Sequence, residues 1–192
     1  TPISTLRGTV ELLRDDEDMP REQRAKFLDN ATKELDRLER LVTGLLRLAR
    51  AEEGGTRERV DLDALMLDIG QRYPKVRVTP GAGSVNGNSE QLGVALENLV
   101  ANAVRYGQVV QVTGVSTSEH SGFEVQDDGP GISAANQARV FDRFFTTERG
   151  TGGTGLGLAL VRAIVQRHGG TIQLDSRPGC TCFRITLPRS AA

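Results

Sequence analysis

The chain has 192 residues, of which 38% are hydrophobic and 26% charged, and it contains no tryptophan. This is the composition of an ordinary globular protein, and the length accommodates one large domain or a small element followed by one domain. A formal net charge of −1 gives no electrostatic reason to expect nucleic acid or an anionic membrane as a partner, and no apolar run approaches the length of a membrane span.

The first 53 residues predict two antiparallel helices. In residues 1–19, apolar side chains recur at spacings of three and four and therefore share one helix face. These are Ile3, Leu6, Val10 and Leu13. An acidic stretch ending in Pro20 interrupts the pattern, and a second helix is expected from about Arg21 to Glu52. Its matching stripe consists of Phe27, Ala31, Leu35, Leu38, Val42, Leu45 and Ala49.

Two helices cannot close a core alone, so we expect this hairpin to dimerise into a four-helix bundle. The alternative is a monomeric hairpin packed on the domain that follows. A hinge is expected at residues 54–58, because the two glycines after Glu53 end the helical period.

Residues 59–192 alternate between short strand-like and helical segments. Strands are expected around residues 60–62, 76–78, 110–112, 123–127, 172–174 and 183–187, and helices around 63–73, 88–107 and 156–168. The predicted fold class is therefore an α/β (α+β) sandwich with a mixed sheet, preceded by the helical hairpin.

The predicted helix over residues 88–107 carries a row of polar side chains. At about 100° per residue, Asn98, Asn102 and Arg105 lie on one side, opposite an apolar stripe. Amide oxygens suit Mg²⁺, and a guanidinium suits a phosphate oxygen. The alternative interpretation is a polar face exposed to solvent.

A strand-like alternation then leads to Asp127, whose carboxylate ends a predicted buried face. Since an unpaired carboxylate there would be costly, Asp127 is expected to accept a hydrogen bond from a donor such as an exocyclic amine. Gly129 and Gly131 would let the backbone approach a flat ligand. By itself this segment is also compatible with an ordinary turn.

A glycine-rich run from Gly150 to Gly157 precedes an apolar helix that is expected to start near Leu156. Backbone amides at a helix start bind phosphate oxygens. A glycine-rich run is, however, more often a flexible linker. The connection over residues 133–155 suggests a lid over a nucleotide, mobile when empty. The order of these three segments in one domain favours a nucleotide site.

The cysteines and histidines are expected to be structural. Cys180 and Cys182 lie one residue apart in a predicted strand and are interpreted as reduced thiols. His120 falls in a polar turn, and His168 ends a helix, where a cation suits the helix dipole.

These segments resemble the N, G1, F and G2 boxes of the ATP-binding catalytic domain of sensor histidine kinases, within the gyrase, heat-shock chaperone, histidine kinase and mismatch-repair ATPase superfamily. Residues 141–145 are similar to the F box, and residues 179–183 to a shortened final glycine box. The resemblance covers almost the whole chain and implies a Bergerat-type ATP-binding fold with ATP and Mg²⁺ as cofactors.

The resemblance also implies the roles of individual residues. Asn98 and Asn102 would hold Mg²⁺, and Asp127 would accept a hydrogen bond from the adenine amine. The candidate catalytic residues are Asn98, Arg105 and Arg143. The candidate nucleotide-binding residues are Asn102, Tyr106, Asp127, Gly129, Gly131, Arg149, Gly153, Gly155, Leu156, Gly157 and Thr181.

The hairpin resembles the family's dimerisation and histidine-phosphotransfer element. The H box of that element places a histidine and an acidic residue shortly before a Thr-Pro pair. Because the chain begins at Thr1-Pro2, the phosphoacceptor histidine is expected just upstream of this sequence. Thr1 matches the position that the family uses to orient water for dephosphorylating the response regulator.

The resemblance therefore implies the cytoplasmic kinase core of a two-component sensor histidine kinase. It would be a homodimer, pass phosphate from histidine to a response-regulator receiver domain, and belong to a parent anchored in the bacterial inner membrane by segments outside this sequence. By itself the chain is not expected to autophosphorylate.

ATP hydrolysis is expected to be very slow. The hydrolysing relatives carry a Glu four residues before the metal-binding Asn, where this chain has Asn98, and Glu97 points about 100° away. Two alternatives remain. One is a nucleotide-binding dimeric interaction module without kinase activity of its own, and the other is a serine-directed anti-sigma kinase, which fits the Thr-Pro hairpin poorly.

Overall fold

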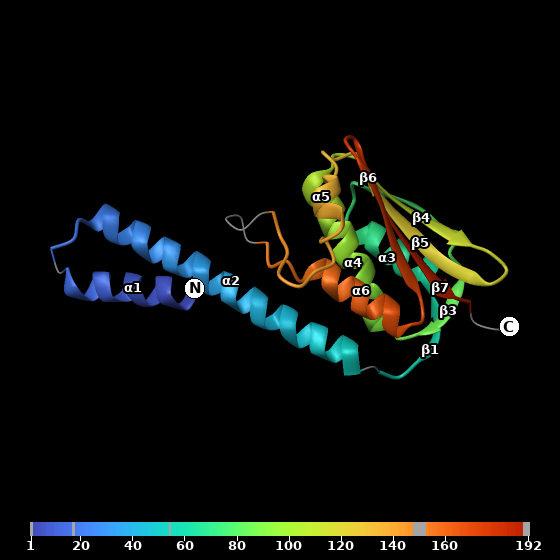
Figure 1. Ribbon diagram of the computed structural model, residues 1–192, viewed down its shortest axis with the longest axis horizontal. Helices are drawn as coiled ribbons and strands as arrows, with labels where there is room; N and C mark the ends of the chain where they lie inside the picture. Colours follow the sequence, from blue (N-terminus) through green and yellow to red (C-terminus); the bar gives the residue numbers. More distant parts are fainter. Residues whose placement is uncertain (1, 17, 54, 148–152, 190–192) are drawn as a thin grey trace.

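The computed structural model describes residues 2–16, 18–53, 55–147 and 153–189, and it contains a helical hairpin followed by an α/β domain (Figure 1). The hairpin consists of α1 (Pro2–Asp15) and α2 (Arg21–Glu53). At 1.5 Å per residue, the 33 residues of α2 span about 50 Å. Helix α2 therefore extends well past α1 and runs along the α/β domain, where it packs against α6.

The α/β domain is built around a mixed five-stranded sheet. Its elements are β1 (Glu58–Asp61), α3 (Leu62–Arg72), β2 (Val76–Thr79), β3 (Ser84–Gly87), α4 (Ser89–Tyr106), β4 (Val110–Ser116), β5 (His120–Asp127), α5 (Ala134–Gln137), α6 (Gly157–Arg167), β6 (Thr171–Arg177) and β7 (Cys180–Pro188). The strand order is β2-β4-β5-β7-β6, with β2 and β4 parallel and the other neighbours antiparallel. Helices α3, α4 and α6 cover one face of this sheet (Figure 1). The predicted α/β sandwich behind a helical hairpin is confirmed.

Helix α4 lies within the predicted residues 88–107 and is capped at both ends. The Asn88 side chain accepts a hydrogen bond from the backbone N–H of Gln91 at 2.9 Å, which satisfies one of the free amides at the helix start. The Gly107 N–H donates to the Ala103 carbonyl at the other end. One face of α4 is buried against the sheet and α6 by Leu92, Ala95, Leu96, Leu99, Val100 and Ala103.

The hydrophobic core reaches into the hairpin at one end only. Leu48 and Ala51, in the last turns of α2, belong to the same buried cluster as Phe123 of the sheet. The apolar stripe of the hairpin is different, because six of its predicted members remain exposed. These are Ile3, Val10, Leu35, Val42, Leu45 and Ala49.

Some features were not predicted. Strand β3 pairs with β1 as a separate two-stranded sheet, and it has a single central valine rather than an alternating pattern. The short helix α5 lies within the 133–155 connection, where no helix was predicted. His120, which was placed in a turn, is instead the first residue of β5.

Cys180 and Cys182 are free thiols on β7. Burial, together with the nearby Glu124 carboxylate, raises the pKa of the Cys182 thiol to about 11. The thiolate, which is the reactive form, is therefore scarce at neutral pH. None of the described helices combines the length and apolar character that a membrane span requires.

Candidate nucleotide site

A cavity of about 930 Å³ lies between α4, the start of α6, the connection after β5 and the middle of α2. This volume is typical of sites for small organic ligands. The cavity brings together most of the predicted site residues. They are Asn98, Asn102, Arg105, Tyr106, Asp127, Gly131, Gly153, Gly155, Leu156, Gly157 and Thr181.

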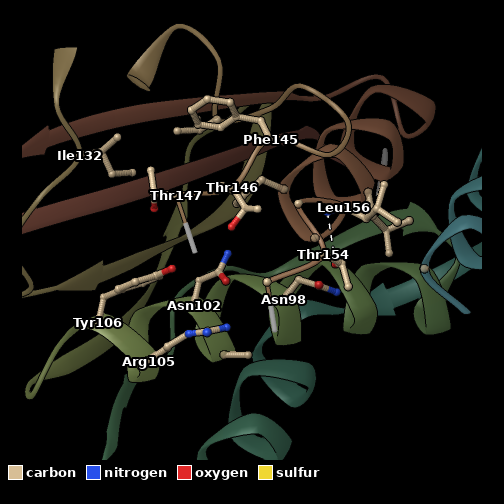
Figure 2. Close-up of a pocket in the computed structure, with 18 of the residues that line it drawn as sticks. Asn98, Asn102, Arg105, Tyr106, Ile132, Phe145, Thr146, Thr147, Thr154 and Leu156 are labelled. Carbon is tan, nitrogen blue, oxygen red and sulfur yellow. Dashed lines mark hydrogen bonds between the residues drawn. The ribbon is translucent and has the colours of Figure 1, made fainter. Parts of the chain in front are cut away.

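Helix α4 supplies the polar row predicted from its sequence. Figure 2 shows Asn98, Asn102, Arg105 and Tyr106 along one edge of α4, facing the segment that carries Thr146. The Asn98 amide nitrogen donates to the Val94 carbonyl at 2.8 Å, which fixes the orientation of its side-chain amide. The Asn98 oxygen thus points away from α4.

Gly157, the first residue of α6, lies against that oxygen. A Cβ added at Gly157 would be 2.9 Å from Asn98 Oδ1, closer than real Cβ contacts come. Glycine at this position therefore keeps the oxygen of Asn98 accessible from the cavity.

Asp127 lies beside Gly107, at the C-terminal end of α4, whereas Gly157 lies beside Asn98 in the middle of that helix. Asp127 is the last residue of β5, pairs with Thr181 of β7, and is 6% exposed. Its Oδ1 accepts a hydrogen bond from the Gly129 N–H at 2.9 Å, and this is the only donor to the carboxylate among the described residues. Burial raises the pKa of Asp127, the Gly129 amide partly opposes that rise, and the Asp128 charge adds to it. The second carboxylate oxygen can accept a hydrogen bond from a ligand donor.

Two glycines of the cavity wall occupy positions that other residues would not tolerate. Gly131 has φ +78° and Gly155 has φ +67°, in the left-handed region. A Cβ at Gly131 would come within 2.5 Å of the Arg177 carbonyl oxygen, and one at Gly155 within 2.5 Å of the Phe144 backbone. The Gly155 carbonyl also accepts a hydrogen bond from the Phe144 N–H at 2.8 Å. The connection after α5 is thereby fastened to the loop that leads into α6.

Three predicted residues are not in the cavity wall as described. Arg143 is exposed and does not line the cavity. Gly129 does not line it either, although its amide bonds to Asp127. Arg149 lies outside the described residues, as does part of the predicted lid.

Glu97 points away from the cavity, as its position on the helix predicts. Its carboxylate accepts a hydrogen bond from the Arg72 guanidinium of α3 at 3.0 Å. It does not line the cavity.

The sequence analysis missed the contribution of α2. Five residues of its middle section line the cavity, namely Glu39, Arg40, Thr43, Gly44 and Arg47. The one signal that pointed there is Gly44, because a glycine inside a helix costs about 1 kcal/mol relative to alanine and usually has a packing reason. That reason is Leu156, whose Cδ1 would lie 2.9 Å from a Cβ at Gly44.

Comparisons with known proteins agree with this architecture. Residues 87–191 match the family described as histidine kinase-, DNA gyrase B-, and HSP90-like ATPase, and residues 1–54 match the His Kinase A (phospho-acceptor) domain. The solved structure of the mycobacterial sensor histidine kinase MprB is 32% identical with a TM-score of 0.58, and the match covers 70% of this chain and 99% of that one. The chain belongs to the sensor histidine kinase family.

Other histidine kinases match over nearly the whole chain. The probable sensor histidine kinase TcrY of Mycobacterium tuberculosis is 38% identical over 205 residues, which cover 98% of this chain and 43% of TcrY. The structure of the Acinetobacter baumannii histidine kinase AdeS shares the fold, with a TM-score of 0.72 at 22% identity over 100% of this chain and 96% of that one. The chain thus spans less than half the length of TcrY and carries a phospho-acceptor-type hairpin joined to an ATP-binding domain. The hairpin match also argues against the anti-sigma kinase alternative.

Proposed function

We propose that the chain binds ATP and Mg²⁺ in this cavity and that the whole protein transfers the γ-phosphoryl group to a histidine. The observation that carries the proposal is the convergence of the α4 polar edge, the buried Asp127 carboxylate and the glycine-rich start of α6 on one cavity. Catalysis in such a site consists mainly of positioning and charge neutralisation.

At the base end, the unbonded oxygen of Asp127 would accept a hydrogen bond from the adenine amine. A carboxylate that is buried with a single donor is stabilised by a second one, which favours a ligand that presents an N–H there. Thr181 and Gly131 would lie beside the base.

At the phosphate end, Asn98 and Asn102 would hold Mg²⁺, which when bound neutralises phosphate charge. Arg105 and Tyr106 would contact the phosphates or the ribose. The backbone amides of Gly153, Gly155 and Gly157 would bind phosphate oxygens, since they precede or open α6 and carry no side chain that blocks approach. The Leu156 N–H, which donates to Thr154 Oγ1 at 3.4 Å, is the fourth candidate. Arg143 and Arg149 remain candidates for the γ-phosphate side.

The arrangement supports transfer rather than hydrolysis. Helix α4 offers no carboxylate to the cavity, because Glu97 is bonded to Arg72 on another face. We therefore expect very slow ATP hydrolysis.

The phosphoacceptor histidine is proposed to lie upstream of Thr1, since the chain's two histidines are both in the α/β domain. The chain alone would then not autophosphorylate. The start of α1 lies beside α2 (Figure 1), so an upstream continuation of α1 would run toward the part of α2 that reaches the cavity.

The same proposal covers organisation and partners. The exposed apolar stripe supports homodimerisation through the hairpin, and a response-regulator receiver domain would accept the phosphate. A hairpin of residues 1–53, a hinge at 54–58 and a catalytic domain at 59–192 remain the proposed division. The parent protein would place this part in the cytoplasm and be anchored in the inner membrane elsewhere.

A nucleotide-binding interaction module without kinase activity is the second candidate, favoured by the absence of a hairpin histidine in this sequence. The test is to add a separate hairpin that carries an intact H box, with labelled ATP. Acid-labile phosphate on the added hairpin supports the kinase, and none supports the module.

Calorimetric titration with a non-hydrolysable ATP analogue and Mg²⁺ tests the binding site itself. Asp127→Asn should weaken binding by about 10- to 100-fold, because the single amide oxygen is used by Gly129 and an NH₂ then faces the adenine amine. Asp128→Asn is the matched control, since one oxygen of Asp128 accepts both of its backbone hydrogen bonds, from Gln108 and Val109. Equal affinity for Asp127→Asn and the unsubstituted chain would refute the proposal.

A further inference from the structure

The middle of α2 forms one wall of the nucleotide cavity. Arg40, Gly44 and Arg47 follow one another at spacings of four and three, so they share one helix face. All three line the cavity. The hairpin therefore contributes two guanidinium groups to a site that is otherwise built by the α/β domain.

The contact between α2 and the α/β domain lies at the phosphate end of the cavity. Gly44 packs on Leu156, with only 3.5 Å between an ideal Cβ at Gly44 and the Leu156 Cβ. Leu156 directly precedes α6 and belongs to the glycine-rich loop. Arg40 and Arg47 thus lie about one helical turn to either side of the loop proposed to bind phosphates.

Helix α2 is also fastened near its end. Leu48 and Ala51 are buried in the core of the α/β domain. The Arg167 guanidinium donates to the Glu53 carbonyl, and the Gln91 side chain donates to the Arg50 carbonyl, each at 3.4 Å. These contacts hold the face with Arg40 and Arg47 toward the cavity.

The two guanidiniums have no partners within the described part of the chain. Neither Arg40 nor Arg47 makes an ion pair or a side-chain hydrogen bond there, whereas Arg37 of the same helix pairs with Glu34. Among the described residues, the charged side chains of the cavity wall are Glu39, Arg40, Arg47, Arg105 and Asp127. With Asp127 at the base end, the phosphate end carries an excess of cations.

We propose that Arg40 and Arg47 bind the phosphates of the nucleotide, so that a nucleoside triphosphate clamps α2 of the hairpin against the start of α6. This inference rests on the proposed function, because it assumes that the cavity takes an adenine nucleotide. Guanidinium groups bind phosphate oxygens through paired N–H donors, and a triphosphate offers more such oxygens than a monophosphate. Occupancy of the γ-phosphate position would thereby be sensed by the hairpin.

The first test compares two ligands by calorimetry on the full chain. Replacing both residues, Arg40→Ala with Arg47→Ala, should weaken binding of a non-hydrolysable ATP analogue by about 10- to 100-fold and leave AMP binding within about twofold. Arg50→Ala is the matched control, because Arg50 is exposed on the same helix, makes no side-chain bond to a described residue and does not line the cavity. An analogue affinity for the double variant equal to that of Arg50→Ala would overturn the inference.

The second test measures the clamp directly. With Cys180 and Cys182 replaced by serine, Gly44→Cys and Leu156→Cys would place two thiols at a spacing suited to a disulfide, given the 3.5 Å between Cβ positions. The intrachain cross-link should form several-fold faster with the ATP analogue than with AMP, and the Arg40 and Arg47 substitutions should remove that difference. Cross-linking that is equally fast with both ligands would contradict the clamp.

The two hypotheses fail in different ways. If the unsubstituted chain binds no adenine nucleotide, or if Asp127→Asn binds normally, the proposed function fails. If binding and the Asp127 effect are both present while the double arginine variant behaves like Arg50→Ala, only the role of the hairpin arginines fails.

Discussion

Helix α4 and the α1–α2 hairpin carry the same kind of apolar periodicity in different surroundings. In α4, Leu96 and Leu99 are completely buried. In α2, Leu35 and Val42 are 56% and 55% exposed. The difference shows that a helical apolar stripe predicts which face of the helix is buried, but not whether the same chain or another molecule buries it.

The covered stripe should dominate the stability of the α/β domain. Leu99→Ala is expected to lower its free energy of unfolding by about 2–5 kcal/mol, because it leaves a cavity in a closely packed core. Leu35→Ala, in the exposed stripe, should change the same quantity by less than about 0.5 kcal/mol. Urea unfolding followed by circular dichroism measures both, since the chain has no tryptophan. Similar losses for both variants would contradict the distinction between the two stripes.

The uncovered stripe should instead control association. Val42→Glu is expected to raise the dimer dissociation constant by at least about 10-fold, because it places a charge in the proposed dimer seam. Sedimentation equilibrium measures this effect. Thr32→Glu, at an exposed position of the same helix outside the stripe, is the control and should leave association nearly unchanged. If Val42→Glu leaves the dimer dissociation constant unchanged, the two subunits associate through another surface.

His168 makes the junction between α6 and α4 sensitive to acid. Its Nε2 accepts a hydrogen bond from the Asn88 N–H at 2.9 Å, and its Nδ1 donates to the Ile164 carbonyl at 2.7 Å, so the ring is neutral. Burial lowers the pKa of His168; the Ile164 carbonyl opposes this, and the nearby Arg57 and Arg167 charges add to the lowering.

Because the folded-state pKa of His168 lies below the unfolded-state value of about 6.5, protons favour the unfolded state. This contribution to stability is fully present above that value and is lost as the pH falls toward the folded-state pKa. His168→Ala should cost about 1–3 kcal/mol at pH 7.5, because the Asn88 N–H loses its acceptor, and should flatten the acid dependence of urea unfolding. His120→Ala, at the exposed start of β5, is the control. An unchanged acid dependence in His168→Ala would show that other groups set it.

The smallest effect is expected at Glu97. Its pair with Arg72 is exposed, with 44% of each side chain accessible, so Glu97→Gln should cost less than about 1 kcal/mol. ATP hydrolysis in a coupled assay should remain at its low level, because Glu97 does not reach the cavity. Asp68→Asn, which removes the other carboxylate paired with Arg72, is the control. A clear fall in hydrolysis only in Glu97→Gln would identify it as a catalytic base.

Much of the catalytic side of the cavity could be predicted from local sequence. The polar edge of α4, its Asn88 cap and the inward Asp127 at the end of β5 are encoded within single elements, because helix and strand periods determine which side chains share a face. Gly131 and Gly155 were also among the predicted site residues, whereas their positive φ is known only from the structure.

The remaining features depend on contacts between distant segments. Strand β3 exists because it pairs with β1, where Val85 lies opposite Val60, and its own four residues carry no strand pattern. The approach of Gly44 to Leu156, which turns Arg40 and Arg47 toward the cavity, joins the middle of α2 to the start of α6. Periodicity within a segment therefore determined which faces are apolar or polar, whereas only tertiary packing decided which surfaces meet, because that choice depends on the shapes of both partners.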